Sequence, residues 1–174
     1  APAQKPRSLE WGRWFADVRP ADQITSTREN ARIKGGENRE VAVGNSDFIL
    51  YRTPKSDLDP VNLARLGPLD FKLTGGTAHL LNQSIETLTF GESSLSVDVS
   101  RNLFNTSLQL FGTDGRQMSI TAKGEASPDG FFVANGAGGR VAGAVAHDGK
   151  NAAYLFEQQR RNGRISGVTE WERK

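Results

Sequence analysis

Two histidines, His79 and His147, are the side chains of this 174-residue sequence best suited to proton transfer or metal binding. They form no H-x-x-x-H motif, and the chain has no cysteine, so neither a zinc site nor a disulfide is expected. No G-x-S-x-G motif occurs, and no acid and hydroxyl pair has a histidine near it in sequence. We therefore predict no catalytic residue, no metal and no cofactor, and we expect both histidines to be solvated near turns.

Glycine-rich segments in the second half raise the question of a phosphate-binding loop. In GAGGRVAG (136–143), a G-x-G-x-x-G motif starting at Gly136 would require glycine where Val141 stands. GAVAHDGKN (143–151) resembles a Walker loop, but it has one residue too many between its glycines, and Asn151 replaces serine or threonine. We interpret the small residues as easing the tight curvature of a small barrel.

Arginines are the best candidates for binding, because guanidinium groups suit carboxylates and phosphates. RRNGR (160–164) is a predicted hairpin tip, and SRNLFN (100–105) is expected to turn at the same end of the molecule. A mixed arginine and aromatic patch there would suit a protein or an acidic glycan. The alternative is that charged tips only keep a β-protein in solution. The predicted binding residues are Arg101, Phe104, Arg160, Arg161 and Arg164, followed by Arg28, Arg32 and Arg39 of the long connection.

The tryptophans support two interpretations. Trp11 and Trp14 lie in LEWGRW (9–14), and Trp171 lies near the C-terminus. They could form a stacking surface for a sugar or a base. We favour a structural role, in which the first and last strands pair to close a barrel and these aromatics meet across the seam.

Alternating apolar and polar residues indicate strands over much of the chain. In SSLSVDVS (93–100), Leu95, Val97 and Val99 share one face of a half-buried strand. Asp-Gly or Asn-Gly pairs at 114–115, 129–130, 148–149 and 162–163 favour hairpin turns. Earlier, DPVNLARLG (59–67) could form one or two helical turns with Asp59 as the N-cap. The nine candidate strands are 9–15, 47–53, 69–75, 93–100, 106–111, 117–124, 140–147, 152–159 and 164–171.

The predicted fold is all-β: an antiparallel up-and-down β-barrel of about eight strands with a filled apolar interior. Closing such a barrel requires an even number of strands, so one candidate lies outside it or continues a neighbour through a bulge. Residues 1–8 are predicted to be a linker, and 9–174 a single barrel domain with a long loop at 16–46. The side chains expected to face inward are Leu95, Val97, Val99, Leu108, Leu110, Met118, Ile120, Val141, Val145 and Leu155.

Charge and hydropathy exclude several functional classes. The 22 basic and 20 acidic residues give a net charge of +2, whereas nucleic-acid binding requires a clustered basic patch. No apolar run is long enough for a membrane helix. A transmembrane barrel would require an apolar outer surface, but Ser96, Asp98, Gln109 and Ser119 lie opposite the apolar faces. We expect the chain to fold without detergent.

Several motifs together resemble the C-terminal β-barrel domain of FecR-family bacterial envelope proteins. They are LEWGRW, FILYRTP, GPLDFKLTGGT, SSLSVDVS with NTSLQL, and the ending GRVAGAVAHDGKNAAYLFEQQRRNGRISGVTEW, which is the most specific. That barrel is similar in turn to the barrels of transferrin-binding protein B and related surface lipoproteins. This sequence lacks their lipid-attachment cysteine, and it lacks a counterpart of their handle subdomain unless residues 16–46 supply one.

The resemblance implies a non-enzymatic binding or assembly module in the periplasm or on the surface of a Gram-negative bacterium. Its partner would be a protein or an acidic glycan, and no nucleic acid. A lipocalin-like carrier of a small ligand is the alternative, since it shares the architecture but requires a hollow barrel.

Overall fold

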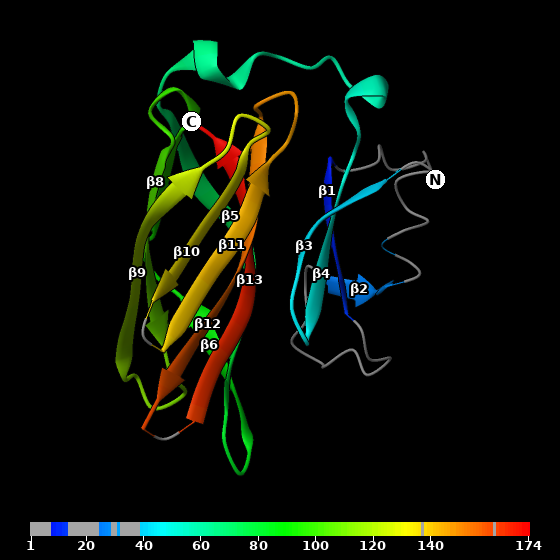
Figure 1. Ribbon diagram of the computed structural model, residues 1–174. Coiled ribbons are helices and arrows are strands. Elements are labelled where there is room, and N and C mark those ends of the chain that lie inside the picture. The colour runs from blue at the N-terminus through cyan, green and yellow to red at the C-terminus, as the bar shows by residue number, and fades with distance from the viewer. Residues whose placement is uncertain (1–7, 14–24, 29–30, 32–38, 137, 162) are drawn as a thin grey trace.

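The computed structural model describes residues 8–13, 25–28, 31, 39–136, 138–161 and 163–174, and it contains two β-sheets (Figure 1). Trp14, Arg32, Asn162 and most of the predicted loop 16–46 lie outside the described residues. Short 3₁₀ helices are formed by Lys55–Asp57, Leu63–Leu66 and Val99–Arg101, and no helix among the described residues is long and apolar enough to cross a membrane.

The larger sheet closes into an antiparallel barrel. Each strand pairs with its sequence neighbour except that β6 and β7 do not pair with each other, and β5 pairs with β13 to complete the ring. β6 and β7 both lie between β5 and β8, β6 toward one end of the barrel and β7 toward the other, so together they occupy one position in the ring. The predicted all-β barrel is therefore confirmed. Its strands are β5 (Leu69–Leu81), β6 (Ile85–Phe90), β7 (Ser94–Asp98), β8 (Leu103–Phe111), β9 (Gln117–Ala126), β10 (Phe131–Gly136), β11 (Gly139–Val145), β12 (Asn151–Arg160) and β13 (Gly163–Arg173).

The smaller sheet has four strands in the order β2-β1-β4-β3. They are β1 (Leu9–Arg13), β2 (Thr25–Thr27), β3 (Glu40–Gly44) and β4 (Phe48–Arg52). The expected seam between the first and last strands is wrong, because β1 pairs with β4 and β2, and β13 pairs with β5. Trp11 and Trp171 consequently lie in different hydrophobic clusters.

The turns follow the sequence signals closely. Gly115, Gly130 and Gly149, each preceded by aspartate, have φ angles of 82°, 85° and 73°, which favour glycine. The expected helical turn at 59–67 is a 3₁₀ helix, Leu63–Leu66. Its N-cap is Asn62 and not Asp59, because the Asn62 side chain accepts a hydrogen bond from the Ala64 N–H.

Aromatic side chains fill the barrel interior. The Tyr154 ring stacks on Trp171 with centroids 5.7 Å apart, and it meets the edges of Phe132 and Phe156 at 6.1 and 6.3 Å. The Tyr154 hydroxyl lies 2.7 Å from the Thr106 hydroxyl, so its polar atom is satisfied. Burial raises the pKa of Tyr154 far above its ordinary value. The predicted inward residues that join this core are Leu95, Val97, Val99, Leu108, Leu110, Ile120, Val141 and Val145, with Met118 partly buried against it.

Leu155 is the exception among the predicted inward residues. β12 buries both faces: Ala152, Tyr154 and Phe156 face the barrel interior, while Ala153 and Leu155 face the smaller sheet. The prediction was wrong because a strand covered on both faces shows no alternation that would distinguish inside from outside.

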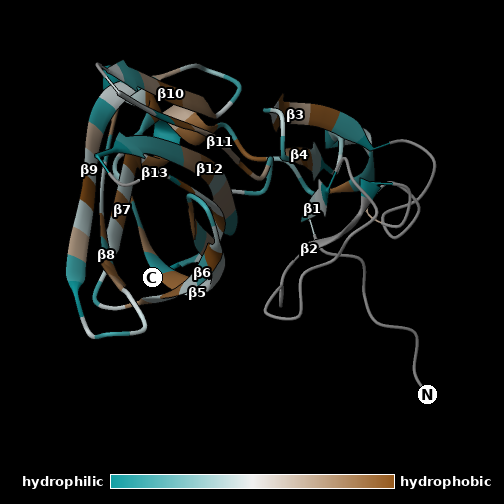
Figure 2. Cartoon of the chain, turned by 90° about the horizontal axis from the view of Figure 1, so that it is seen from below, coloured by the Kyte–Doolittle hydropathy of each residue, from teal (hydrophilic) through white to brown (hydrophobic). Residues whose placement is uncertain are grey.

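The smaller sheet packs on the outer face of β11, β12 and β13 (Figure 2). The smaller sheet contributes four apolar side chains to this interface: Leu9, Trp11, Phe48 and Leu50. Alanines and larger apolar residues form the barrel's contribution: Ala142, Ala144, Ala146, Ala153, Leu155 and Val168. The small alanine side chains let the two sheets approach closely. Trp11 is fully buried and its Nε1 donates to the Thr169 carbonyl at 3.2 Å.

Candidate functional site

The predicted arginine patch does not form, because its two segments lie at opposite ends of the barrel. Arg101 precedes β8 at the end where the Ala126 N–H donates to the Asn102 carbonyl. Arg160 and Arg164 flank the turn at the other end, where Arg164 lies opposite Leu81. The start of β8 pairs with the end of β9, and the successive antiparallel pairings through β10 and β11 place the end of β12 at the opposite end of the barrel.

Phe104 is likewise not on the surface. It is buried in the barrel core, and its ring lies 4.9 Å from that of Phe132. Arg101 is well exposed, and its Nε lies 3.8 Å from an Asp98 carboxylate oxygen. A hydrogen bond from Ser100, followed by one from the Arg101 N–H, holds the pKa of Asp98 below its ordinary value.

The three arginines near the 160–164 turn have different surroundings. Arg164 donates to Asp47 and Glu157, each at 3.2 Å, and so it connects the β3–β4 turn to the barrel. Arg160 is partly buried and donates to the Ser119 carbonyl at 3.2 Å. Arg161 is exposed. Of the three, only Arg161 combines exposure with the absence of any ion pair or hydrogen bond among the described residues.

The two described arginines of the connection 16–46 differ in their exposure to solvent. Arg28 is exposed, and its Nε lies 3.4 Å from the Tyr51 hydroxyl. Arg39 is buried. Burial lowers the pKa of Arg39, and the charge of Glu10 opposes that effect. Whether any of these arginines binds a partner stays a prediction.

Both histidines are buried, so the expectation of solvated histidines is wrong. His79 lies on β5 opposite Ser166, whose hydroxyl donates to Asp47 of the β3–β4 turn. His147 Nε2 lies 2.8 Å from Glu40 Oε1. The smaller sheet, which the sequence did not indicate over these strands, contacts His147 through Glu40, and its β3–β4 turn contacts Ser166, the cross-strand neighbour of His79, through Asp47. Among the described residues, no group of three or more acidic or histidine side chains could hold a metal ion.

A row of side chains crosses the outer face of the barrel from strand to strand. Its members lie opposite one another in the order Leu103, Glu125, Val133, Ala142, Leu155 and Val168. The smaller sheet covers the last three, which are almost fully buried. Beyond the sheet, Val133 is 38% exposed and Leu103 is 53% exposed. The row therefore continues past the edge of the smaller sheet to Val133 and, beyond the exposed Glu125, to Leu103, with no cover among the described residues.

The hollow at this edge is the candidate functional site, which we call the edge groove. It lies between β3 and the outer face of β8 to β11, and its cavity volume is about 720 Å³. β3 is an edge strand of the smaller sheet, and β4 is the strand with which it pairs among the described residues. The residues that line the edge groove include Ala42, Val43, Leu103, Glu125, Phe131, Val133, Arg140 and Ala142.

A charged cluster beneath β3 fixes the position of this wall of the edge groove. Arg52 is 2% exposed, and its Nε donates to Glu40 at 2.9 Å. Its Nη1 donates to the Asp129 carbonyl at 2.7 Å and to the Val145 carbonyl at 3.1 Å. The guanidinium also lies 4.3 Å from the centre of the Phe131 ring. These contacts join β3 and β4 to two turns of the barrel.

Burial and hydrogen bonding act in opposite directions on this cluster. Burial lowers the pKa of Arg52, while Glu40 opposes that effect. Burial alone would raise the pKa of Glu40, but hydrogen bonds from His147 and Arg52 outweigh it and hold that pKa below 4.5. Glu40 is thus an ionised carboxylate at neutral pH, as its two partners require. Farther along β3, Arg140 lies 3.4 Å from the Gly44 carbonyl.

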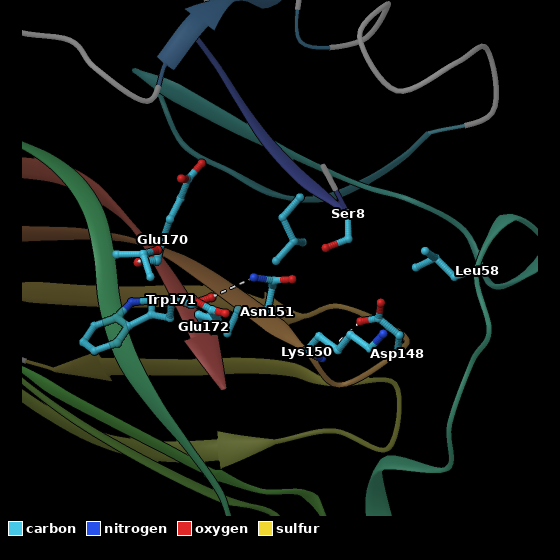
Figure 3. A pocket seen from close by; sticks show the side chains of 11 residues that line it. Ser8, Leu58, Asp148, Lys150, Asn151, Glu170, Trp171 and Glu172 are labelled. Atoms are coloured by element: carbon cyan, nitrogen blue, oxygen red, sulfur yellow. Dashed lines mark hydrogen bonds between the residues drawn. The ribbon is translucent and has the colours of Figure 1, made fainter. Parts of the chain in front are cut away.

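A second hollow, of about 470 Å³, lies where the start of β1 meets the start of β12 and the end of β13 (Figure 3). Its rim is polar and mostly acidic: Asp148, Glu170 and Glu172 line it together with Lys150. The Asn151 side chain lies 3.4 Å from the Trp171 carbonyl at its base. The edge groove is the stronger candidate for recognition, because it presents exposed apolar side chains and a strand edge together.

Comparison with known proteins identifies only distant likenesses. No family model matches the chain, and no curated relative matches it. Among solved structures, the isotype 1 transferrin binding protein B of serogroup B Neisseria meningitidis is 14% identical with a TM-score of 0.47. The match covers 78% of this chain and 32% of that one, so the chain spans about a third of its length. The siderocalin Ex-FABP is 8% identical with a TM-score of 0.32, over 66% of this chain and 75% of that one.

Membership in the FecR family stays a prediction, since no family model supports it. The four-stranded sheet includes Glu40–Gly44 and Thr25–Thr27 from the predicted loop 16–46. That region therefore contributes a second sheet beside the barrel, which the alternation pattern did not reveal because these strands are short.

Proposed function

We propose that this chain is a non-enzymatic module that recognises another protein, and that the edge groove is its binding surface. The observation that carries the proposal is the uncovered continuation of the interface row, with Val133 and Leu103 exposed beside the β3 edge. Contiguous exposed apolar side chains with polar margins are typical of protein interaction sites. The proposed setting, the periplasm or surface of a Gram-negative bacterium, rests on the resemblance of its sequence motifs to FecR-family barrels.

The buried histidines support a binding role over catalysis. His147 is committed to Glu40, and His79 is buried beside Ser166. General acid-base chemistry requires a titratable group that a substrate can reach. Neither histidine is exposed enough to meet that requirement.

A small-ligand carrier has weaker support, because aromatic side chains occupy the barrel interior. A hollow that reaches inward-facing residues opens between β9 and β10, where the two strands pair only at Glu125–Ala126 and Phe132–Val133. Its volume is about 250 Å³. Small-molecule sites usually exceed about 300 Å³. At the 160–164 turn, recognition of an acidic glycan would depend mainly on Arg161, since Arg160 and Arg164 already contact other groups.

The proposed function is tested by introducing charge into the edge groove. Leu103→Asp combined with Val133→Asp should leave the fold intact, because both side chains are exposed. Proteins cross-linked to the wild-type chain in an envelope extract would be identified, purified and titrated calorimetrically. We expect the double variant to bind its partner at least about ten-fold more weakly.

Ile85→Asp is the matched control, since Ile85 is 57% exposed on β6 and lies outside the edge groove. It should change the dissociation constant by less than about two-fold. Unchanged binding of the double variant, or an equal loss with Ile85→Asp, would contradict the proposed site.

A further inference from the structure

We infer that the partner contributes an extended segment that adds to the free edge of β3 and places a basic side chain over Glu125. This inference rests on the proposed function and names the partner's chemistry. It follows from three features: a strand edge without a partner among the described residues, the exposed row beneath it, and one carboxylate.

The edge of β3 that has no partner strand among the described residues supplies main-chain hydrogen-bonding groups. β3 pairs with β4 through Glu40, Val41, Val43 and Gly44, and its other side borders the edge groove. Edge strands are ready templates for strand addition. The register shift between Val41 and Val43 marks a bulge at Ala42, which shortens any added ladder. The groove floor must therefore contribute much of the affinity.

The floor continues at the position that an added strand would occupy. β3 lies over β11, which it contacts directly, at the margin of the smaller sheet (Figure 2). Neighbouring strands in a sheet are about 4.8 Å apart. A strand added beside β3 would therefore lie over β10, and its alternate side chains would face the floor at Val133, with Glu125 on the neighbouring strand β9. It would complete the interface that already buries Ala142 and Leu155.

Glu125 determines the charge of the segment. It lies in the row between Leu103 and Val133, and it is exposed. Among the described residues it forms no ion pair or hydrogen bond. A lysine or arginine on the barrel-facing side of the segment would pair with this carboxylate, while an apolar side chain on the same side covers Val133.

A second copy of this chain does not fit the same edge. Antiparallel pairing of two β3 edges about a two-fold axis would put both barrels on one side of the joined sheet. Each barrel extends beyond its own β3 edge, as the exposed floor residues Leu103 and Val133 show. The two barrels would collide, so the occupant is a segment without a domain on its barrel-facing side.

The test uses a displayed library of random ten-residue peptides, selected on the immobilised whole chain. Peptides that also bind the Leu103→Asp, Val133→Asp variant are removed. We expect the remaining peptides to alternate apolar residues with one lysine or arginine at a fixed position. For the tightest peptide, Glu125→Lys should raise the dissociation constant at least about ten-fold, whereas Glu92→Lys, the same change at an exposed site outside the edge groove, should alter it by less than about two-fold.

Backbone methylation of that peptide tests strand addition directly. N-methyl groups on the alternate amides that face β3 should weaken binding at least about ten-fold, and those on the intervening amides by less than about two-fold. Equal effects of the two sets, or selected peptides with helical i, i+3, i+4 spacing, would overturn strand addition but leave the proposed function standing. A selection that yields no peptide dependent on the edge groove would overturn the inference. A wild-type dimer in sedimentation that the double variant abolishes would also overturn it, because the occupant would then be a second copy.

Discussion

Glu40 connects the edge groove to the barrel, and its contribution to the stability of the fold depends on pH. Its carboxylate accepts from both Arg52 and His147. Its folded-state pKa lies below the ordinary value of 4.5. Glu40 therefore stabilises the fold fully above pH 4.5, and this contribution is lost as pH falls through the folded-state pKa.

In Glu40→Gln, the free energy of unfolding should accordingly fall less steeply as the pH is lowered. We expect the variant to be less stable than the wild type at neutral pH, with the difference shrinking as pH falls below 4.5. Urea unfolding followed by tryptophan fluorescence across this range measures both curves. Asp98 and Asp114, whose pKa values are also lowered by hydrogen bonds, remain in both proteins, so the difference isolates Glu40. A difference that does not change with pH would contradict this assignment.

Arg164 and Arg161 provide a second test at this scale. Arg164 pairs with Asp47 and Glu157, while Arg161 is exposed. Arg164→Ser should lower the free energy of unfolding by about 1 kcal/mol, because two partly buried acids lose their partner. Arg161→Ser should change it by less than about 0.5 kcal/mol. Chemical denaturation measures the free energy of unfolding of both variants. Equal losses in the two variants would mean that the Asp47 contact does not stabilise the packing of the β3–β4 turn on the barrel.

At the scale of elements, β1 anchors the smaller sheet to the barrel. Trp11 is fully buried between the sheets, and its ring meets Phe48 edge-on at 6.4 Å. Its indole nitrogen donates to β13 at Thr169. Trp171, by contrast, lies inside the barrel against Tyr154. The two tryptophans therefore stabilise different units of the structure.

Trp11→Ala should loosen the smaller sheet before the barrel. Removing a buried tryptophan costs about 3–5 kcal/mol, and here the cavity would open between the two sheets. Hydrogen exchange should show lost protection first at β1 and β4, with β8 and β12 still protected. The control is Trp171→Ala, which should instead lower protection throughout the barrel. Uniform loss of protection in Trp11→Ala would indicate that the two sheets unfold as one.

At the scale of the whole molecule, the two sheets depend on each other unequally. The barrel has its own filled core, whereas the apolar face of the smaller sheet is completed by barrel residues such as Leu155 and Val168. A closed barrel also satisfies its own strand edges. The smaller sheet has four short strands and cannot do so.

A fragment of residues 54–174 should therefore fold, and one of residues 1–53 should not. Circular dichroism is expected to show β-structure in the longer fragment alone. Because that fragment exposes the face normally covered by the smaller sheet, it should bind a hydrophobic dye more strongly than the whole chain does. A folded 1–53 fragment would contradict this division of the core.

The sequence by itself determined the elements whose local signals are strong. Alternation specified one face of β7, β8 and β9, and the Asp-Gly pairs specified three of the turns, because side-chain direction and positive φ are properties of a few adjacent residues. The short strands β3, β6 and β10 were missed, since five or six residues carry too little periodicity to stand out.

Only the tertiary structure decided which surfaces meet. Because side chains alternate along a strand, the sequence predicts that Ala152 and Leu155 lie on opposite faces of β12. It does not predict that a second sheet covers the face of Leu155. The same sheet contacts His147 through Glu40, and it leaves Val133 and Leu103 exposed beyond its edge. The positions of Arg101 and Arg160 at opposite ends likewise depend on how many strands separate them. The edge groove was invisible in the sequence because its walls, β3 and β8 to β11, come together only when two separate sheets pack.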